Sequence, residues 1–139
     1  MYRSGRGAYG LHETLADVTG LLQSDGCIAY ESYIKKHDVE RVSCLVHIRR
    51  RFFAGRSNHW ELAELAFKAI QYLYRTEALC RDNSYTSEQR LRVRNWVARP
   101  AYDGLLEWVI YQQRNNLSKG NIGTALGYAK TTCRVCAIT

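Results

Sequence analysis

Proline, acidic residues and long apolar runs are all scarce in this sequence of 139 residues. It has one proline and shows neither an internal repeat nor a low-complexity run, so no segment marks a domain boundary. No apolar run approaches the ~20 residues of a membrane-spanning helix. The stretch from Met1 to Gly10 is polar and glycine-rich rather than signal-like. These absences predict a cytoplasmic protein that does not span a membrane.

The five cysteines lack the pattern of a disulfide-bonded secreted protein. They are odd in number and irregularly spaced, which favours reduced thiols in small buried positions. Two short pairs, Cys44 with His47 and Cys133 with Cys136, could supply the four soft ligands of a structural zinc site. Roughly ninety residues separate the pairs, however, which is a poor match to zinc modules. We therefore predict no zinc site.

The sequence has the composition of a folded, basic domain. Apolar residues make up 46% of it, which is enough to bury a core at this length. The 20 Lys and Arg outnumber the 13 Asp and Glu, so the formal net charge is +7 and the pI is near 9.3. Clustered Lys and Arg favour a polyanionic partner, because they release counterions from phosphates. Charge alone does not choose between DNA, RNA and an acidic membrane.

The first third of the chain has the pattern strand, helix, strand. The apolar pair Leu21-Leu22 leads to the turn pair Asp25-Gly26, which predicts a strand that ends next to Asp25. Two-residue alternation predicts a second strand from Val42 to Val46, with His47 at its end. Helical spacing predicts two short helices, Leu11 to Val18 and Ile28 to His37.

From Trp60 onward the pattern is helical. A long helix is predicted from Trp60 to near Leu79, and Thr86 with Gln89 has the spacing of a capping box that opens the next helix. Pro100 is expected to divide that helix from the following one. The apolar faces of the last two helices are Leu105, Leu106, Val109 and Ile110, and Ile122, Ala125, Leu126 and Ala129. The predicted class is α/β, with a small strand-containing unit followed by a helical block.

Asp25 is the residue with the clearest possible chemistry. An aspartate before glycine most often caps a turn, and the pair is common. At a strand end, a carboxylate can instead supply hard oxygen to Mg²⁺, and paired metal ions activate a nucleophile in phosphodiester chemistry. That chemistry needs more than one carboxylate.

Three consecutive arginines, Arg49, Arg50 and Arg51, precede Phe52 and Phe53. On a helix, neighbours are separated by about a hundred degrees, so the three arginines cannot share one face. Arginine binds phosphate with a bidentate fork, which makes these residues candidate phosphate contacts. Core packing is the predicted role for most of the helical aromatic residues, which are Tyr72, Tyr74, Trp96, Trp108, Tyr111 and Tyr128.

Several motifs follow one another over roughly nine-tenths of the chain. They are Tyr2–Arg6, Leu15–Gly26 with Tyr30, Cys44–Phe52, Leu73–Glu77, Arg90–Arg94 with Arg99-Pro100, Trp108 and Ala125–Ala129. The segment Cys44–Phe52 is similar to the signature C-W-A-H-x-R-R-K-F of the insertion-sequence-66 family of bacterial transposases. The other segments resemble further landmarks of that family's central transposase domain, in the same order.

The resemblance implies an RNase H-like fold with a helical insertion. In that family Asp, Asp and Glu hold two divalent metal ions, Mg²⁺ or Mn²⁺, for DNA cleavage and strand transfer. Asp25 corresponds to the second acid, so it is the implied catalytic and metal-binding residue. His47 belongs to the Cys-x-x-His pair that follows this acid and is the implied supporting residue. We expect Asp25 and His47 on the same side of the small sheet, with Arg49 or Arg50 facing the same cleft.

The resemblance also predicts how the chain is divided. Residues 1–56 are expected to form a partial RNase H-like segment and residues 57–131 the helical insertion. Residues 132–139 diverge from the family, which a frameshift would explain. The family's other two acids lie in an Asp-Glu-Thr motif upstream and an Asn-Asn-x-x-Glu-Arg motif downstream. We therefore expect a transposase fragment that is inactive alone.

The implied partner is the DNA of transposon ends. A homo-oligomer, or a mixed assembly with intact transposase, is also expected. The alternative is a non-catalytic, basic DNA-binding module that interferes with an intact transposase, for which the charge of +7 and the arginine segment argue.

Overall fold

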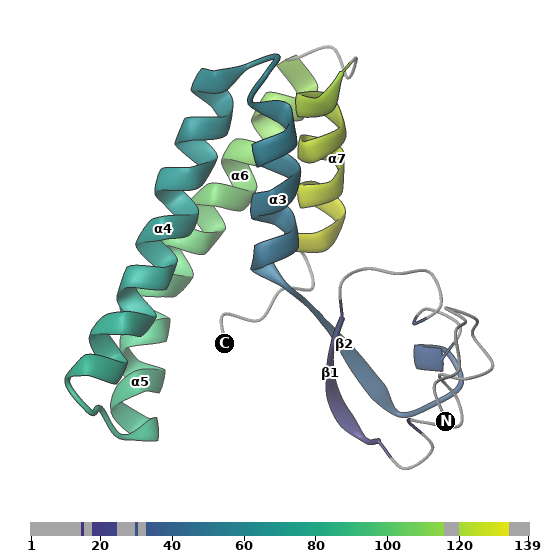
Figure 1. The fold of residues 1–139 in the computed structure, drawn as a ribbon. Coiled ribbons are helices and arrows are strands. Elements are labelled where there is room, and N and C mark those ends of the chain that lie inside the picture. The colour runs from purple at the N-terminus through teal and green to yellow at the C-terminus, as the bar shows by residue number, and fades with distance from the viewer. Residues whose placement is uncertain (1–14, 16–17, 25–29, 31–32, 116–119, 134–139) are drawn as a thin grey trace, which may run out of the picture. The chain divides into compact units, whose positions relative to one another are not determined.

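A computed structural model describes residues 15, 18–24, 30, 33–115 and 120–133 of the chain (Figure 1). These residues are mostly helical, and the strands among them form one two-stranded parallel sheet. The predicted α/β class with a mainly helical content is confirmed. The chain divides into two units, residues 1–44 and residues 45–139. The predicted division at residue 56 concerns which segments belong to a catalytic fold, and it stays a prediction.

The first unit contains the sheet. Strand β1, Gly20–Ser24, pairs in parallel with β2, Val39–Ser43, so that Gly20 lies opposite Val39 and Ser24 opposite Ser43. Parallel strands need a long connection, and residues 25–38 supply it. The predicted first strand is confirmed, and it ends directly before Asp25.

The predicted second strand, Val42 to Val46, is wrong at its far end. Strand β2 stops at Ser43 and helix α3 begins at Leu45, so His47 lies in the first turn of a helix. The physical reason is that Leu45, Ile48 and Phe52 have helical spacing and pack into a helical core. Their burial outweighs the short alternation of Val42, Cys44 and Val46.

A buried tyrosine anchors the connection between the strands. The side chain of Tyr33 is fully buried, its hydroxyl donates a hydrogen bond to the Leu15 carbonyl, and its ring stacks on His37 with 4.1 Å between the ring centroids. Within the predicted helix from Ile28 to His37, the structure describes Tyr30, Tyr33 and Ile34 as helical. Most of the predicted helix from Leu11 to Val18 lies outside the described residues.

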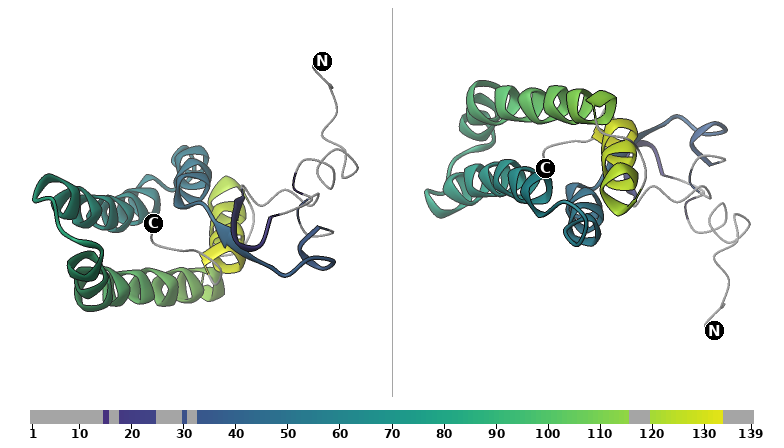
Figure 2. Two further views of the ribbon diagram at one scale, coloured as in Figure 1. Left: turned by 90° about the horizontal axis from the view of Figure 1, so that it is seen from below. Right: turned by 90° about the horizontal axis from the view of Figure 1, so that it is seen from above.

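The second unit is built around four helices. They are α3 (Leu45–Gly55), α4 (Trp60–Asp82), α6 (Arg99–Asn115) and α7 (Asn121–Cys133). Helix α3 packs against α4 and α7, and α6 packs against the same two helices, which closes the ring (Figures 1 and 2). The predicted long helix and the two predicted apolar faces at the end of the chain are confirmed. Helix α7 continues into the first residues of the predicted divergent tail.

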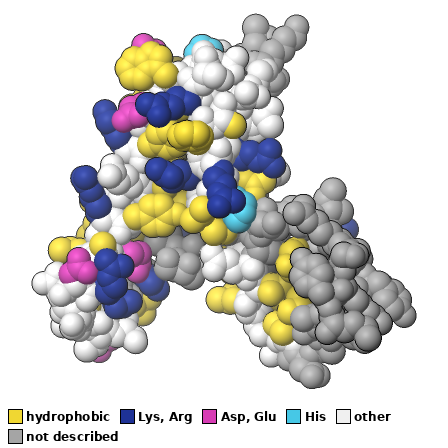
Figure 3. Space-filling view, viewed as in Figure 1, with side chains coloured by type: hydrophobic (Ala, Val, Ile, Leu, Met, Phe, Trp, Pro, Cys, Tyr) yellow, Lys and Arg dark blue, Asp and Glu magenta, His cyan; other side chains and the backbone are white. Residues whose placement is uncertain are grey.

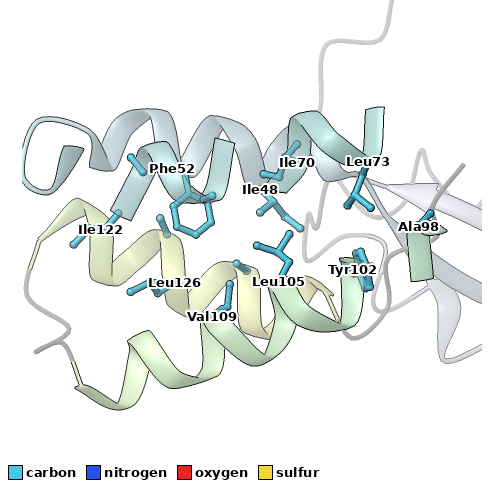
Figure 4. Packing of buried hydrophobic residues seen from close by; sticks show 14 residues of the cluster. Ile48, Phe52, Ile70, Leu73, Ala98, Tyr102, Leu105, Val109, Ile122 and Leu126 are labelled. Carbon is cyan, nitrogen blue, oxygen red and sulfur yellow. The ribbon is translucent and has the colours of Figure 1, made fainter. Parts of the chain in front are cut away.

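Every helix of the ring contributes buried side chains to the core of this unit (Figure 4). It consists of Ile48, Phe52, Ala63, Ala66, Ile70, Leu73, Ala98, Tyr102, Leu105, Val109, Ile122, Ala125, Leu126 and Ala129. Cys80 is a fully buried free thiol, as predicted for the cysteines, whereas Cys44 is half-buried. Burying such apolar side chains is the main force that holds helices together.

The expected break at Pro100 is wrong. Helix α5, Ser87–Val93, opens with the predicted capping box between Thr86 and Gln89, but it then runs through a π-helical turn, Arg94–Ala98, directly into α6. In that turn the Arg99 N–H bonds to the Arg94 carbonyl, five residues back. The wider turn places the proline where its missing N–H and its ring are tolerated.

Helices α3 and α7 approach closely at Gly55. A Cβ at this position would lie 3.0 Å from the Cα of Ile122, which is a backbone atom that cannot simply rotate away. In contrast, a Cβ at Gly104 of α6 would meet no atom of the described residues within 4 Å.

We predict that Gly55→Ala lowers the free energy of unfolding by about 1–3 kcal/mol, because the added methyl group forces the two helices apart. Gly104→Ala is the matched control and should raise it by about 0.5–1 kcal/mol, because alanine favours an exposed helix over glycine. Urea denaturation followed by far-UV circular dichroism measures both. A Gly55→Ala variant as stable as the parent would contradict the close packing.

A bidentate ion pair joins α4 to the π-helical turn. Arg94 donates from Nε to Glu77 Oε1 over 2.6 Å and from Nη2 to Oε2 over 2.9 Å. The Glu77 side chain is only 17% exposed. The hydrogen bonds from Arg94 hold the pKa of Glu77 below its ordinary value, although burial opposes this shift. The same contact raises the pKa of Arg94.

Glu77→Gln should lower the free energy of unfolding by about 1–3 kcal/mol at neutral pH, since it removes charge-assisted hydrogen bonds. The folded-state pKa of Glu77 lies below the unfolded one, so the contribution is complete above the unfolded pKa and is lost as pH falls through the folded pKa. The parent and the variant should therefore converge in acid. Glu88→Gln is the control, because the Glu88–Arg92 pair is exposed and should contribute under about 1 kcal/mol. Curves that stay equally far apart at all pH values would refute the assignment.

Candidate functional site

The carboxyl ends of both strands lie at the same end of the sheet. Because β1 and β2 are parallel and Ser24 lies opposite Ser43, the residues that follow the two strands leave the sheet at the same edge. In sequence these are Asp25 and Cys44. Asp25 itself lies outside the described residues, so its predicted position beside His47 stays a prediction.

His47 occupies the first turn of α3 and is half-buried. Its Nδ1 atom is buried and has no hydrogen-bond partner among the described residues. A buried nitrogen without a partner costs free energy, so this atom is a candidate for an interaction that the described residues do not supply. His47 belongs to α3, the helix that follows β2, and not to the strand.

The three arginines spread around α3 as predicted for consecutive helical residues. The Arg49 guanidinium lies 5.5 Å from the ring centroid of Phe67 on α4, and that of Arg51 lies 5.0 Å from the ring centroid of Tyr128 on α7. Arg50 lies between them, and all three side chains are exposed. Stacking over aromatic rings orients two of these guanidinium groups without covering them.

An open groove runs between α3 and α4. Its lining residues are Val46 and Arg49 on α3 and Glu64, Phe67, Gln71 and Tyr74 on α4, and its volume is about 400 Å³. On the face that shows these helices, Lys and Arg side chains alternate with hydrophobic ones (Figure 3). This face combines positive charge with exposed aromatic surface.

A family model described as "Transposase IS66 family" matches residues 1–135. The chain belongs to the IS66 transposase family. The resemblance inferred from the motif order is therefore confirmed. No curated protein and no solved structure matches the chain significantly. The match extends into the segment predicted to diverge after Thr131.

Membership in the IS66 family makes this a transposase-derived protein. It implies DNA of transposon ends as a partner and a chemistry that generally depends on divalent metal ions. Among the described residues, no group of three or more His, Cys, Asp or Glu side chains could hold a metal ion. Asp25 and Cys136 lie outside those residues. No helix in the described part of the chain is long and apolar enough to cross a membrane.

Sequence reasoning assigned several aromatic residues of this IS66 protein to the core wrongly. Tyr74 is 40% exposed, Tyr72 50%, Tyr111 62% and Trp96 83%. Trp108 and Tyr128 do pack against the core, as predicted. The groove residues of α4 were missed as a set, although Phe67, Gln71 and Tyr74 have the spacing of one helix flank and that signal was available.

Proposed function

We propose that this chain contributes one acid, Asp25, to the divalent-metal site of an Asp-Asp-Glu transposase, and that the arginines of α3 bind the DNA backbone. The parent enzyme would cleave DNA and transfer strands during transposition. The observation that carries the proposal is the parallel pair of strands whose shared carboxyl edge is followed by Asp25 in a chain of the IS66 family. Ligands of open parallel sheets bind at such edges.

A partial RNase H-like unit is the fold that we propose for the first part of the chain, residues 1–56, with residues 57–131 as the helical insertion. The parallel register of β1 and β2 and the helical residues between them support this proposal. The helix ring formed from α3, α4, α6 and α7 supports a mainly helical insertion. On this proposal α3 belongs to the catalytic segment in sequence and packs with the insertion.

Asp25 alone does not complete the donor set for this chemistry. In such a site, metal ions supply an activated nucleophile and stabilise the leaving oxygen, and they need several carboxylate ligands. The described residues offer no cluster of that kind. We propose that Asp25 would hold one metal ion together with the family's other two acids, which belong to the Asp-Glu-Thr and Asn-Asn-x-x-Glu-Arg motifs.

His47 is proposed as a supporting residue. Its Nδ1 atom is buried and has no partner among the described residues, and the histidine belongs to the first turn of α3 and to the Cys44–His47 pair of the family signature. A histidine there can donate or accept one proton or hydrogen bond near the phosphate path. Arg49, Arg50 and Arg51 would offer guanidinium forks to phosphates, because all three are exposed.

We predict that the purified 139-residue chain does not nick supercoiled plasmid DNA with Mg²⁺ or Mn²⁺, since one carboxylate binds such ions weakly. Gel electrophoresis of the plasmid measures nicking. Nicking that survives in an Asp25→Ala control would reveal a contaminant. Nicking that disappears in that control would show a complete active site and would overturn this part of the proposal.

We also predict electrostatic, sequence-tolerant binding to duplex DNA, with affinity that falls steeply as salt rises. Replacing one phosphate contact, Arg50→Ala, should reduce the slope of log K against log salt by about one. Arg92→Ala is the matched control, because Arg92 is exposed on α5 and pairs with Glu88. It should leave the slope unchanged. Binding that remains tight and sequence-selective in high salt would contradict the prediction.

A non-catalytic DNA-binding module is the second candidate, favoured by the exposed arginines of α3 and the charge of +7. Under this alternative Asp25 has no metal to hold. Titration with Mn²⁺, followed by electron paramagnetic resonance, separates the two: weak binding that is lost in Asp25→Asn supports the transposase-site proposal. Binding that the substitution leaves unchanged supports the alternative.

A further inference from the structure

The groove between α3 and α4 has a flat aromatic side. Phe67 lies under the guanidinium of Arg49, and Phe53 packs beside Phe67 with 6.4 Å between ring centroids. Tyr74 lines the groove two helical turns further along α4 and is 40% exposed. Aromatic rings and guanidinium planes are the surfaces on which unstacked nucleic-acid bases stack.

The same groove has a polar side that can read the edge of a base. Glu64 and Gln71 both line it from α4. A carboxylate only accepts hydrogen bonds, whereas an amide both donates and accepts. An exocyclic amino group, as on cytosine, adenine or guanine, can donate to Glu64. Thymine presents a carbonyl oxygen, O4, where cytosine presents its amino group, and the carboxylate would repel that oxygen.

The charges favour a neutral base inside the groove and phosphates outside it. Glu64 places negative charge in the groove, while Arg50 of α3 and Lys68 of α4 are exposed nearby on the same two helices. Arg49 lines the same groove and balances the charge of Glu64, so the interior has no net charge from this pair, whereas a phosphate is attracted to the Lys and Arg side chains on the surrounding face (Figure 3). A volume of about 400 Å³ lies in the range of small-ligand pockets and is enough for one base.

We propose that this groove binds a single unpaired DNA base that carries an exocyclic amino group. The base would stack against Arg49 and Tyr74, and its edge would bond to Glu64 and Gln71. The proposal rests on DNA being the partner of this chain. It assigns the helical unit a role that backbone-binding arginines do not supply, namely the capture of a base displaced from the duplex.

The test compares three fluorescein-labelled duplexes of otherwise identical sequence in fluorescence anisotropy titrations with the full 139-residue chain. One is fully paired, one has an unpaired cytosine, and one has an unpaired thymine. The cytosine duplex should bind roughly tenfold tighter than the paired one, the gain that stacking of one base typically gives. The thymine duplex should show less of this preference.

Substitutions of groove residues test whether the preference for an unpaired base arises in the groove. Tyr74→Ala and Gln71→Ala should remove the preference for the unpaired base while the affinity for paired duplex stays the same. Tyr72→Ala is the matched control, since Tyr72 is also half-exposed on α4 but does not line the groove, and it should keep the preference. Glu64→Gln should abolish the difference between cytosine and thymine. Circular dichroism checks that each variant is folded.

The outcomes separate this proposal from the proposed function. Salt-dependent binding with equal affinity for paired and unpaired duplexes would overturn the base-binding groove alone. A preference that persists in Tyr74→Ala and Gln71→Ala would also overturn it. An absence of any DNA binding would overturn both the groove and the DNA-binding part of the proposed function.

Discussion

Burial of one face of α3 is the constraint on which the helical unit depends. Ile48 and Phe52 are almost completely covered, and Gly55 lets α7 approach at the same face. Once that face is fixed toward the core, every other position of the helix is fixed as well, because the helical repeat leaves no rotational freedom. The orientation of Arg49, Arg50 and Arg51 is therefore a consequence of core packing. The same packing fixes the position of His47, which directly precedes Ile48 in α3.

The register of the sheet fixes the geometry of the first unit, as burial of one face of α3 fixes that of the second. Only in a parallel pair do both carboxyl ends meet at one edge, and the pairing of Ser24 with Ser43 brings those ends level. Val39 and Val42 of β2 are both buried, and because they stand three residues apart on a strand, they lie on opposite faces of the sheet. Each face of β2 therefore has a buried valine, while the pairing of Ser24 with Ser43 brings the two strand ends level.

Much of the fold follows from local patterns, because long helices repeat their signal many times. Helix α4 and the apolar face of α7 could be read from spacing, and the capping box at Thr86 from two residues. The boundary between β2 and α3 could not be predicted from spacing. Five alternating residues compete there with a helical stripe of apolar residues, and the burial of that stripe depends on α4 and α7. The π-helical turn before Pro100 is equally invisible, because a proline alone does not reveal whether the helix breaks or widens.

The candidate site likewise contains residues that could be predicted from the sequence and residues that could not. Asp25 could be selected through the order of the family motifs, because an aspartate before glycine by itself most often caps a turn, whereas the arginines could be selected from residue type and clustering. The groove depends on which helix lies beside α3, so the spacing of Gln71 and Tyr74 places them on one flank of α4 but does not show that this flank faces α3.

Arg49 connects the two kinds of surface in the helical unit. Its guanidinium is held over Phe67, so one of the three arginines proposed to bind phosphate also forms part of the groove wall. Arg50 is the next residue along the same helix, so a phosphate that it bound would lie close to the groove wall. Because α3 and α4 are packed through Ile48, Ala63 and Ile70, the spacing between the arginines and the groove is set by the core rather than by a loop. A DNA strand whose backbone follows α3 would accordingly meet the groove at a fixed position, and only a base turned away from its partner could enter it.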